Sequence, residues 1–71
     1  MTVITDPQQL GSLVRERRKS LGLTQTELAT LCNLSLNGIS NIEKGTTDIR
    51  LSTLQKISTF LGFKIVLEWE K

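Results

Sequence analysis

Three short polar side chains, Asn37, Ser40 and Asn41, are the residues of this sequence with the clearest capacity for chemistry. Their spacing places them on one face of a helix. That face would offer two amides and a hydroxyl, and an asparagine amide can hydrogen-bond both polar groups of an adenine edge. Leu36 adds an apolar tip that could contact a thymine methyl group, and Lys44 adds a cation at the end of the helix. These residue types suit the major groove of DNA.

Residues for catalysis or metal binding are scarce. The chain has no histidine and a single cysteine, Cys32, which excludes a zinc site of the usual kind and an internal disulfide. No nucleophile stands with a candidate base, and no glycine-rich loop could hold a phosphate group. We therefore expect no enzyme activity, no cofactor and no metal, and we expect Cys32 to lie in the core.

Length and charge limit the other possibilities. The 71 residues suffice for one small domain, so a second subunit is the expected source of further stability. The net charge of +2 does not by itself indicate nucleic acid, although four of the five residues from Arg15 to Lys19 are cations. We expect Arg15 and Lys19 to be solvated. No segment has transmembrane length and no signal sequence opens the chain, which indicates a cytoplasmic protein.

Capping signals divide most of the chain into four helices. The predicted N-caps are Asp6 before Pro7, Thr24 and Ser52 in capping boxes with Glu27 and Gln55, and Ser35. The predicted C-terminal residues are Gly22, Asn33, Gly45 and Gly62, which tolerate a left-handed backbone. The helices are therefore expected over about residues 7 to 21, 25 to 32 and 36 to 43, and between Ser52 and Gly62.

The dipeptide Asn37-Gly38 carries a competing signal, because Asn-Gly between apolar residues is typical of a tight hairpin turn. We interpret it as the first turn of a helix, since Ser35, Ile39 and Ile42 fit a helix and no strand pattern flanks it. Gly38 weakens the helix, but it leaves no side chain there, so another molecule could approach the backbone closely.

The C-terminal segment has a period of two. Phe63, Ile65, Leu67 and Trp69 alternate with Lys64, Val66, Glu68 and Glu70, which predicts a strand, with a fifth helix as the alternative. A lone apolar strand needs a partner, and residues 2–5 are only a weak candidate for one. We therefore expect pairing with the same strand of a second copy, with Phe63, Ile65, Leu67 and Trp69 forming the interface of a homodimer.

The second and third helices, with the short connection between them, predict a helix-turn-helix unit from Gln25 to about Glu43. Apolar residues stand where the two helices must bury one another, namely Leu28, Cys32, Leu34, Ile39 and Ile42. Ala29 is small where the two backbones would approach closely. This packing leaves the polar face of the third helix pointing outward.

From about Leu10 to Gly62 the sequence resembles the Cro/repressor-type, or Xre-like, helix-turn-helix family. The matching motifs are Leu23-Thr24-Gln25, Glu27-Leu28-Ala29, Ile39-Ser40, Ile42-Glu43-Lys44-Gly45, Leu51-Ser52-Thr53-Leu54 and Leu61-Gly62. Asn33 stands where the family usually has glycine. The opening LGSLVRERRKSLGLTQ and the C-terminal strand look more like HipB-type antitoxins, small dimeric repressors that join through such a strand and bind a HipA-type kinase toxin.

The resemblance implies an all-α, lambda-repressor-like bundle of four helices plus a C-terminal β-strand that pairs across a homodimer. Residues 1–62 would be the DNA-binding part and residues 63–71 the dimerisation strand of the same single domain. Thr24 and Gln25 would bond phosphates at a helix N-terminus, Ser35, Asn37, Ser40 and Asn41 would face DNA, and Lys44 and Thr46 would flank the backbone. Arg18 and Glu43 would form a structural salt bridge. We further expect Arg17 to reach a phosphate.

The function implied is a transcriptional repressor that acts at the nucleoid on double-stranded operator DNA. It would regulate its own operon, as the antitoxin of a HipA-like kinase toxin. Two alternatives stay open: a plain Xre-family regulator without a toxin partner, and a protein-interaction module that does not bind DNA.

Overall fold

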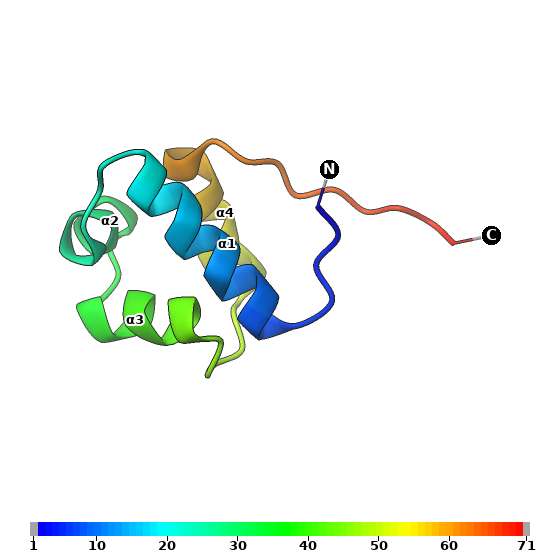
Figure 1. Cartoon of the computed structure of the whole chain (residues 1–71), viewed down its shortest axis with the longest axis horizontal. Helices are drawn as coiled ribbons and strands as arrows, with labels where there is room; N and C mark the ends of the chain where they lie inside the picture. The colour runs from blue at the N-terminus through cyan, green and yellow to red at the C-terminus, as the bar shows by residue number, and fades with distance from the viewer. Residues whose placement is uncertain (1, 71) are drawn as a thin grey trace.

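Four helices account for most of the computed structural model, which describes residues 2–70. They are α1 (Pro7–Ser20), α2 (Gln25–Cys32), α3 (Leu36–Lys44) and α4 (Leu51–Leu61) (Figure 1). The predicted boundaries at Met1 and Lys71 lie outside the described residues. The predicted all-helical bundle of four helices is confirmed, and α2 has the predicted bounds.

Three of the predicted N-caps are confirmed by hydrogen bonds. Asp6 Oδ1 accepts a bond of 2.7 Å from the Gln9 N–H, and Ser35 Oγ accepts one of 2.9 Å from the Gly38 N–H. Thr24 forms the complete capping box with the third residue of α2. Each bond satisfies a backbone N–H that has no partner within its own helix.

The turn between α2 and α3 depends on a left-handed asparagine. Asn33 has φ 54° and ψ 45°, and its N–H donates to the carbonyl groups at the end of α2. This confirms that asparagine takes the conformation that the turn requires. The Leu34 N–H also returns to the Ala29 carbonyl at 2.8 Å. The connection is therefore tight enough to hold α2 and α3 at a fixed angle.

The prediction for the start of α4 is wrong. The helix begins at Leu51, with Arg50 as its N-cap and no side-chain capping bond, so Ser52 lies inside the first turn. Ile49 packs against the core just before this point. Packing of the half-buried Ile49 and the buried Ile57 against the core is compatible with a start at Leu51, and tertiary packing commonly overrides a local signal such as that at Ser52.

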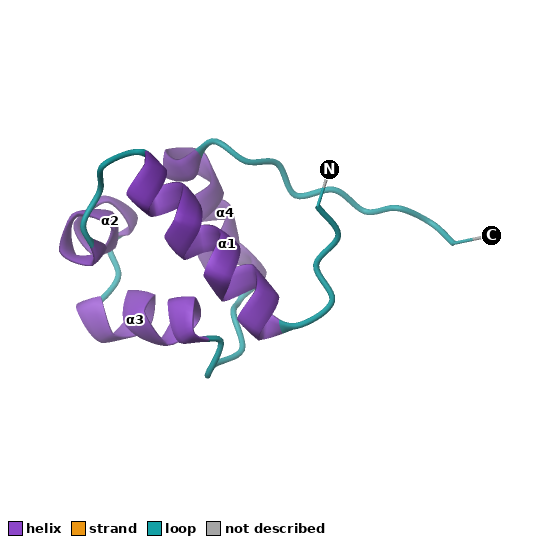
Figure 2. Ribbon diagram, in the orientation of Figure 1, coloured by secondary structure: helices purple, strands orange, loops and turns teal. Residues whose placement is uncertain are grey.

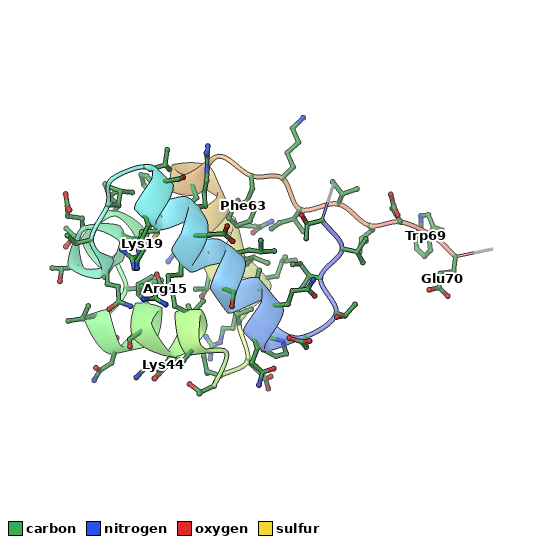
Figure 3. All side chains as sticks on the ribbon, viewed as in Figure 1. Arg15, Lys19, Lys44, Phe63, Trp69 and Glu70 are labelled. Carbon is green, nitrogen blue, oxygen red and sulfur yellow. The ribbon has the colours of Figure 1, made fainter. Side chains whose placement is uncertain are left out.

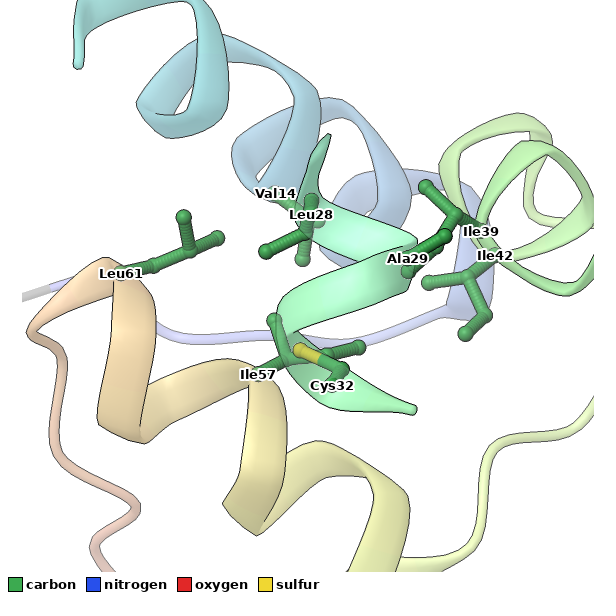
Figure 4. Close-up of a cluster of buried hydrophobic side chains, with 8 residues drawn as sticks. All are labelled: Val14, Leu28, Ala29, Cys32, Ile39, Ile42, Ile57 and Leu61. Carbon is green, nitrogen blue, oxygen red and sulfur yellow. The ribbon is translucent and has the colours of Figure 1, made fainter. Parts of the chain in front are cut away.

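One apolar core joins the four helices (Figure 4). It consists of Val14 from α1, Leu28, Ala29 and Cys32 from α2, Ile39 and Ile42 from α3, and Ile57 and Leu61 from α4. Leu28, Ile39, Ile57 and Leu61 are completely buried. Because each helix contributes, the core fixes the orientation of α3 relative to the other three.

Residues 63–70 form neither a strand nor a helix (Figure 2). The alternative of a fifth helix is therefore wrong, and the predicted strand is not formed in the single chain, because a β-ladder needs a second strand. Phe63 packs against the core of its own chain, whereas Leu67 is 81% and Trp69 89% exposed. Residues 64–70 thus extend away from the helices as an apolar tail (Figure 1). Residues 2–5 also form no strand.

Candidate nucleic-acid interface

One face of α3 carries the side chains predicted to contact DNA. The core residues Ile39 and Ile42 turn the opposite side of the helix outward. On that side Leu36, Asn37 and Asn41 are exposed and Ser40 is half-buried. The structure therefore brings two amides, a hydroxyl and an apolar tip together on a rigid helix, which is the arrangement that reading base edges requires.

Hydrogen bonds hold both ends of this face. Ser35 caps the start of α3, and the Thr46 hydroxyl donates to the Asn41 carbonyl at 3.3 Å. A hydroxyl that accepts one bond can still donate another, so Ser35 keeps a donor for a phosphate oxygen. Lys44 is exposed in the last turn of α3, next to Thr46 along the chain. Lys44 and Thr46 thus lie at the C-terminal end of the polar face, where the predicted contacts with the DNA backbone would be made.

A complete capping box holds the N-terminus of α2. The Thr24 N–H donates to Glu27 Oε1 and the Glu27 N–H donates to Thr24 Oγ1, both at 3.0 Å. The backbone N–H of Thr24, and then its hydroxyl, hold the pKa of the Glu27 carboxyl below its ordinary value of 4.5. The cap is therefore ionised at neutral pH, and the start of α2 stays ordered.

Gln25 lies in the first turn of α2 and is half-buried. Its Nε2 donates to Glu43 Oε1 at 3.1 Å, so this amide joins α2 to α3. One amide hydrogen is thereby used inside the protein. The predicted phosphate contact at this position rests on the second amide hydrogen and on the Gln25 backbone N–H.

The predicted ion pair between Arg18 and Glu43 is present. Arg18 Nε donates to Glu43 Oε2 at 2.7 Å and Nη2 donates to Oε1 at 3.1 Å, with side-chain exposures of 7% and 2%. Arg18 Nη1 also donates to the Leu23 carbonyl at 2.6 Å. With the bond from Gln25, this buried network ties α1, α2 and α3 together behind the polar face.

Two cations of α1 lie closer to the interface than the sequence predicted. An open groove between α1 and the starts of α2 and α3 is lined by residues that include Arg15, Lys19, Thr24, Thr26 and Leu36. Figure 3 labels Arg15 and Lys19 on α1. Two cations beside a helix N-terminus favour an anion such as a phosphate. Their spacing could have indicated this position, because Arg15 lies three residues before Arg18 and Lys19 one residue after it, and Arg18 faces α3. Both side chains are exposed, as predicted, but they lie beside the candidate interface rather than on an unrelated surface.

Arg17 lies elsewhere. Its Nε donates to the Leu61 carbonyl at 2.8 Å, at the C-terminus of α4. In Figure 1 this end of α4 lies on the side of the molecule away from α3. A guanidinium at a helix C-terminus satisfies a carbonyl that has no partner within the helix. This position gives no support to the phosphate contact predicted for Arg17.

Gly11 positions α3 against α1, and sequence analysis missed it. It is buried in α1, and a Cβ atom there would lie 2.3 Å from the Ile42 carbonyl oxygen and 2.7 Å from that of Glu43. Glycine therefore allows the backbones of α1 and α3 to touch. Only the helical spacing of Gly11 with Val14 and Arg18 could have indicated that it faces inward.

Cys32 has the predicted place in the core. The thiol is free, and burial raises its pKa above the ordinary value of 9.0 while Lys56 opposes the shift. The thiol is therefore protonated at neutral pH. Among the described residues there is no cluster of three or more metal-binding side chains, and no helix that is long and apolar enough to cross a membrane.

Comparisons with known sequences identify a helix-turn-helix family and several related regulators. A helix-turn-helix family model, HTH_3, matches residues 14–67. Control protein C.BamHI of Bacillus amyloliquefaciens is 42% identical over 53 residues, which cover 73% of this chain and 65% of that protein. An uncharacterised HTH-type transcriptional regulator of Sinorhizobium medicae is 34% identical over 61 residues, which cover 86% of this chain and 44% of that protein. The chain thus spans less than half of the Sinorhizobium regulator.

Comparisons with solved structures extend the match to the tail. The restriction-modification controller protein C.AhdI of Aeromonas hydrophila has a TM-score of 0.77 and 30% identity, over 80% of this chain and 86% of that one. A chain of the HipA-HipB-O2-O3 complex has a TM-score of 0.83 and 31% identity over 100% of both chains. The protein belongs to the Xre-type helix-turn-helix family, the family of these transcriptional regulators and controller proteins.

Proposed function

We propose that this protein is a sequence-specific DNA-binding repressor that acts as a homodimer. The observation that carries the proposal is the polar face of α3, where Asn37 and Asn41 are exposed opposite the buried Ile39. Each copy would place α3 in the major groove, with base contacts from the amides and phosphate contacts from the groove that Arg15 and Lys19 line. Two copies about 34 Å apart would read a pseudo-palindrome.

The proposed dimer uses the apolar tail. Ile65 is 43% exposed, and Leu67 and Trp69 are more exposed still, on alternate positions of an extended segment. A second copy would cover this face by antiparallel pairing about a two-fold axis. Phe63 packs on its own core and would contribute only the edge of the interface. Pairing would also satisfy the backbone groups of the tail.

A more specific proposal is autoregulation as the antitoxin of a HipA-like kinase toxin. It is supported by the full-length likeness to chains of the HipA-HipB-O2-O3 and HipB-O4 complexes, which includes the tail, whereas the match to C.AhdI covers 80% of this chain. The higher identity to control protein C.BamHI favours a plain regulator instead. A HipA-like kinase gene beside this one, and a complex of the two purified proteins on a sizing column, would support the antitoxin role. The absence of both would favour the plain regulator.

Replacing both asparagines of α3 tests the DNA-binding proposal. Asn37→Ala with Asn41→Ala removes two amides that read base edges, each worth about 1–3 kcal/mol of discrimination. Because both copies of the dimer lose the two amides, we expect affinity for the selected operator to fall at least about 1,000-fold, to the level of unrelated DNA, with an unchanged circular dichroism spectrum. Gln55→Ala, on the exposed surface of α4, is the matched control and should bind normally. Retention of sequence preference by the double variant would show that α3 does not read the bases.

A salt titration separates this proposal from a protein-interaction module. Contacts with phosphates release counterions, so log affinity should fall steeply and linearly with log salt concentration. Arg15→Ala should reduce that slope by about two, because one phosphate contact is lost from each copy of the dimer. A flat response of the wild-type protein would favour the module that does not bind DNA.

A charge in the tail tests the proposed dimer. Leu67→Glu would place a carboxylate in the interface, opposite the same residue or its neighbour in the second copy. We expect sedimentation to show a monomer and operator binding to weaken at least tenfold. Val66→Glu changes the alternate face of the same segment, where Val66 is 59% exposed, and should leave the dimer intact. Equal behaviour of the two variants would place the interface elsewhere.

A further inference from the structure

The point where the tail leaves the helices is held by three features. Arg17 Nε donates to the Leu61 carbonyl at 2.8 Å, from a residue 44 positions earlier in the chain. Gly62 follows with φ 76°, and its N–H returns to the Ser58 carbonyl at 2.8 Å. Phe63 then packs against the core. The tail therefore leaves α4 in one direction, and Arg17 is the only one of these restraints that comes from α1.

We infer that Arg17 is a positioning residue that sets the distance between the two α3 helices of the dimer. This inference rests on the proposed function, because it concerns how two copies joined by their tails meet one operator. Arg17 ties α1, which packs against α3, to the Leu61 carbonyl at the end of α4, three residues before the tail begins. The bond thus connects the DNA-reading part of each copy to the segment proposed to pair with the other copy.

A small rotation of the tail where it leaves α4 would move the second copy of the dimer by a large distance along the DNA. Residues 64–70 are seven extended residues at about 3.3 Å each, so the tail is a lever of about 23 Å. A rotation of about 20° at its base moves the far end by about 8 Å, which is about two base pairs along the axis. Without the Arg17 bond, Gly62 and Phe63 alone would define the exit, and several rotations would become accessible.

The same observation distinguishes positioning from direct DNA contact. Arg17 donates to the end of α4 that lies away from α3 in Figure 1, whereas Arg15 lines the groove beside the starts of α2 and α3. The two arginines are neighbours on α1 with equal charge. Removing either takes away one cation, but only Arg17 restrains the tail.

The experiment selects binding sites from a pool of random DNA duplexes with the full-length wild-type protein, Arg17→Ala and Arg15→Ala. For Arg17→Ala we expect the wild-type half-site sequence, a distribution of half-site spacings broadened by about one or two base pairs, and about tenfold weaker binding to the wild-type site. Its salt slope should equal that of the wild type. Arg15→Ala should keep the wild-type spacing and lose about two units of salt slope, one from each copy of the dimer.

Each other result is decisive. An Arg17→Ala spacing distribution like that of the wild type overturns the inference, and a reduced salt slope with wild-type spacing assigns Arg17 to a phosphate instead. If Arg17→Ala does not fold, as judged by its melting curve, Arg17→Met keeps the side-chain stem without the donor and takes its place. If the wild-type protein selects no sequence or only single half-sites, the proposed dimeric repressor is itself wrong and the inference falls with it.

Discussion

Glu43→Ala is expected to lower the free energy of unfolding by about 3–5 kcal/mol, because it leaves the buried guanidinium of Arg18 without its counter-ion. The Arg18 side chain is 7% exposed and makes two bonds to the Glu43 carboxylate. The same substitution removes the acceptor of the Gln25 amide. A domain of 71 residues has a total stability of about 4–10 kcal/mol, so the substitution should remove a large share of it.

Urea unfolding followed by circular dichroism at a fixed protein concentration measures this loss. Trp69 is 89% exposed, so its fluorescence is a poor reporter of the helical core. The matched control is Arg18→Met with Glu43→Leu, which removes both charges and is expected to cost clearly less than Glu43→Ala alone. A loss below about 1 kcal/mol for Glu43→Ala would mean that the pair is not desolvated as the structure indicates.

Local signals predicted the helices well, because most caps act within four residues. Asp6, Thr24 and Ser35 each bond a backbone N–H three residues ahead, and such contacts can be read from sequence alone. The same reasoning failed at Ser52. There the start of α4 depends on how Ile49 and Ile57 reach the core, which is a tertiary requirement.

The candidate site likewise has features that local sequence patterns predict and features that depend on tertiary contacts. The polar face of α3 follows from helical spacing around the buried Ile39, so the sequence predicts it directly. The contact that Arg17 makes within the chain could not be predicted, since its acceptor is a backbone carbonyl 44 residues away that no side-chain pattern reveals. The tail was predicted as a strand from its alternation, but a β-ladder forms only where a second strand supplies the hydrogen bonds, and none pairs with residues 63–70 in the described chain.

The contact between α1 and α3 shows most clearly what local patterns leave out. A glycine inside a helix reads as a weak point, about 1 kcal/mol worse than alanine. At Gly11 the opposite holds, because a Cβ atom would lie 2.3 Å from the Ile42 carbonyl oxygen. The neighbour is backbone, which no rotamer change can move aside. The position of α3 on the bundle therefore depends on the absence of a side chain in α1.

Gly11→Ala is accordingly expected to destabilise the fold by about 3 kcal/mol in spite of the better helix propensity of alanine. Gly38→Ala is the matched control, since a Cβ there would meet only Ser35 Oγ, at 3.1 Å, and its effect on stability should lie within about 1 kcal/mol of zero. Thermal melting of both variants measures the difference. Equal melting temperatures would show that the two backbones do not touch at Gly11.

The folded fraction of Gly11→Ala makes a second, functional measurement possible. To admit the methyl group, α3 must move away from α1, and the carbonyl groups of Ile42 and Glu43 move with it. The ion pair to Arg18 would then lengthen, and Asn37 and Asn41 would meet the groove at a changed angle. We expect operator affinity, corrected for the unfolded fraction, to fall at least tenfold, because base contacts tolerate little displacement. Normal affinity of the folded fraction would mean that α3 keeps its orientation without this contact.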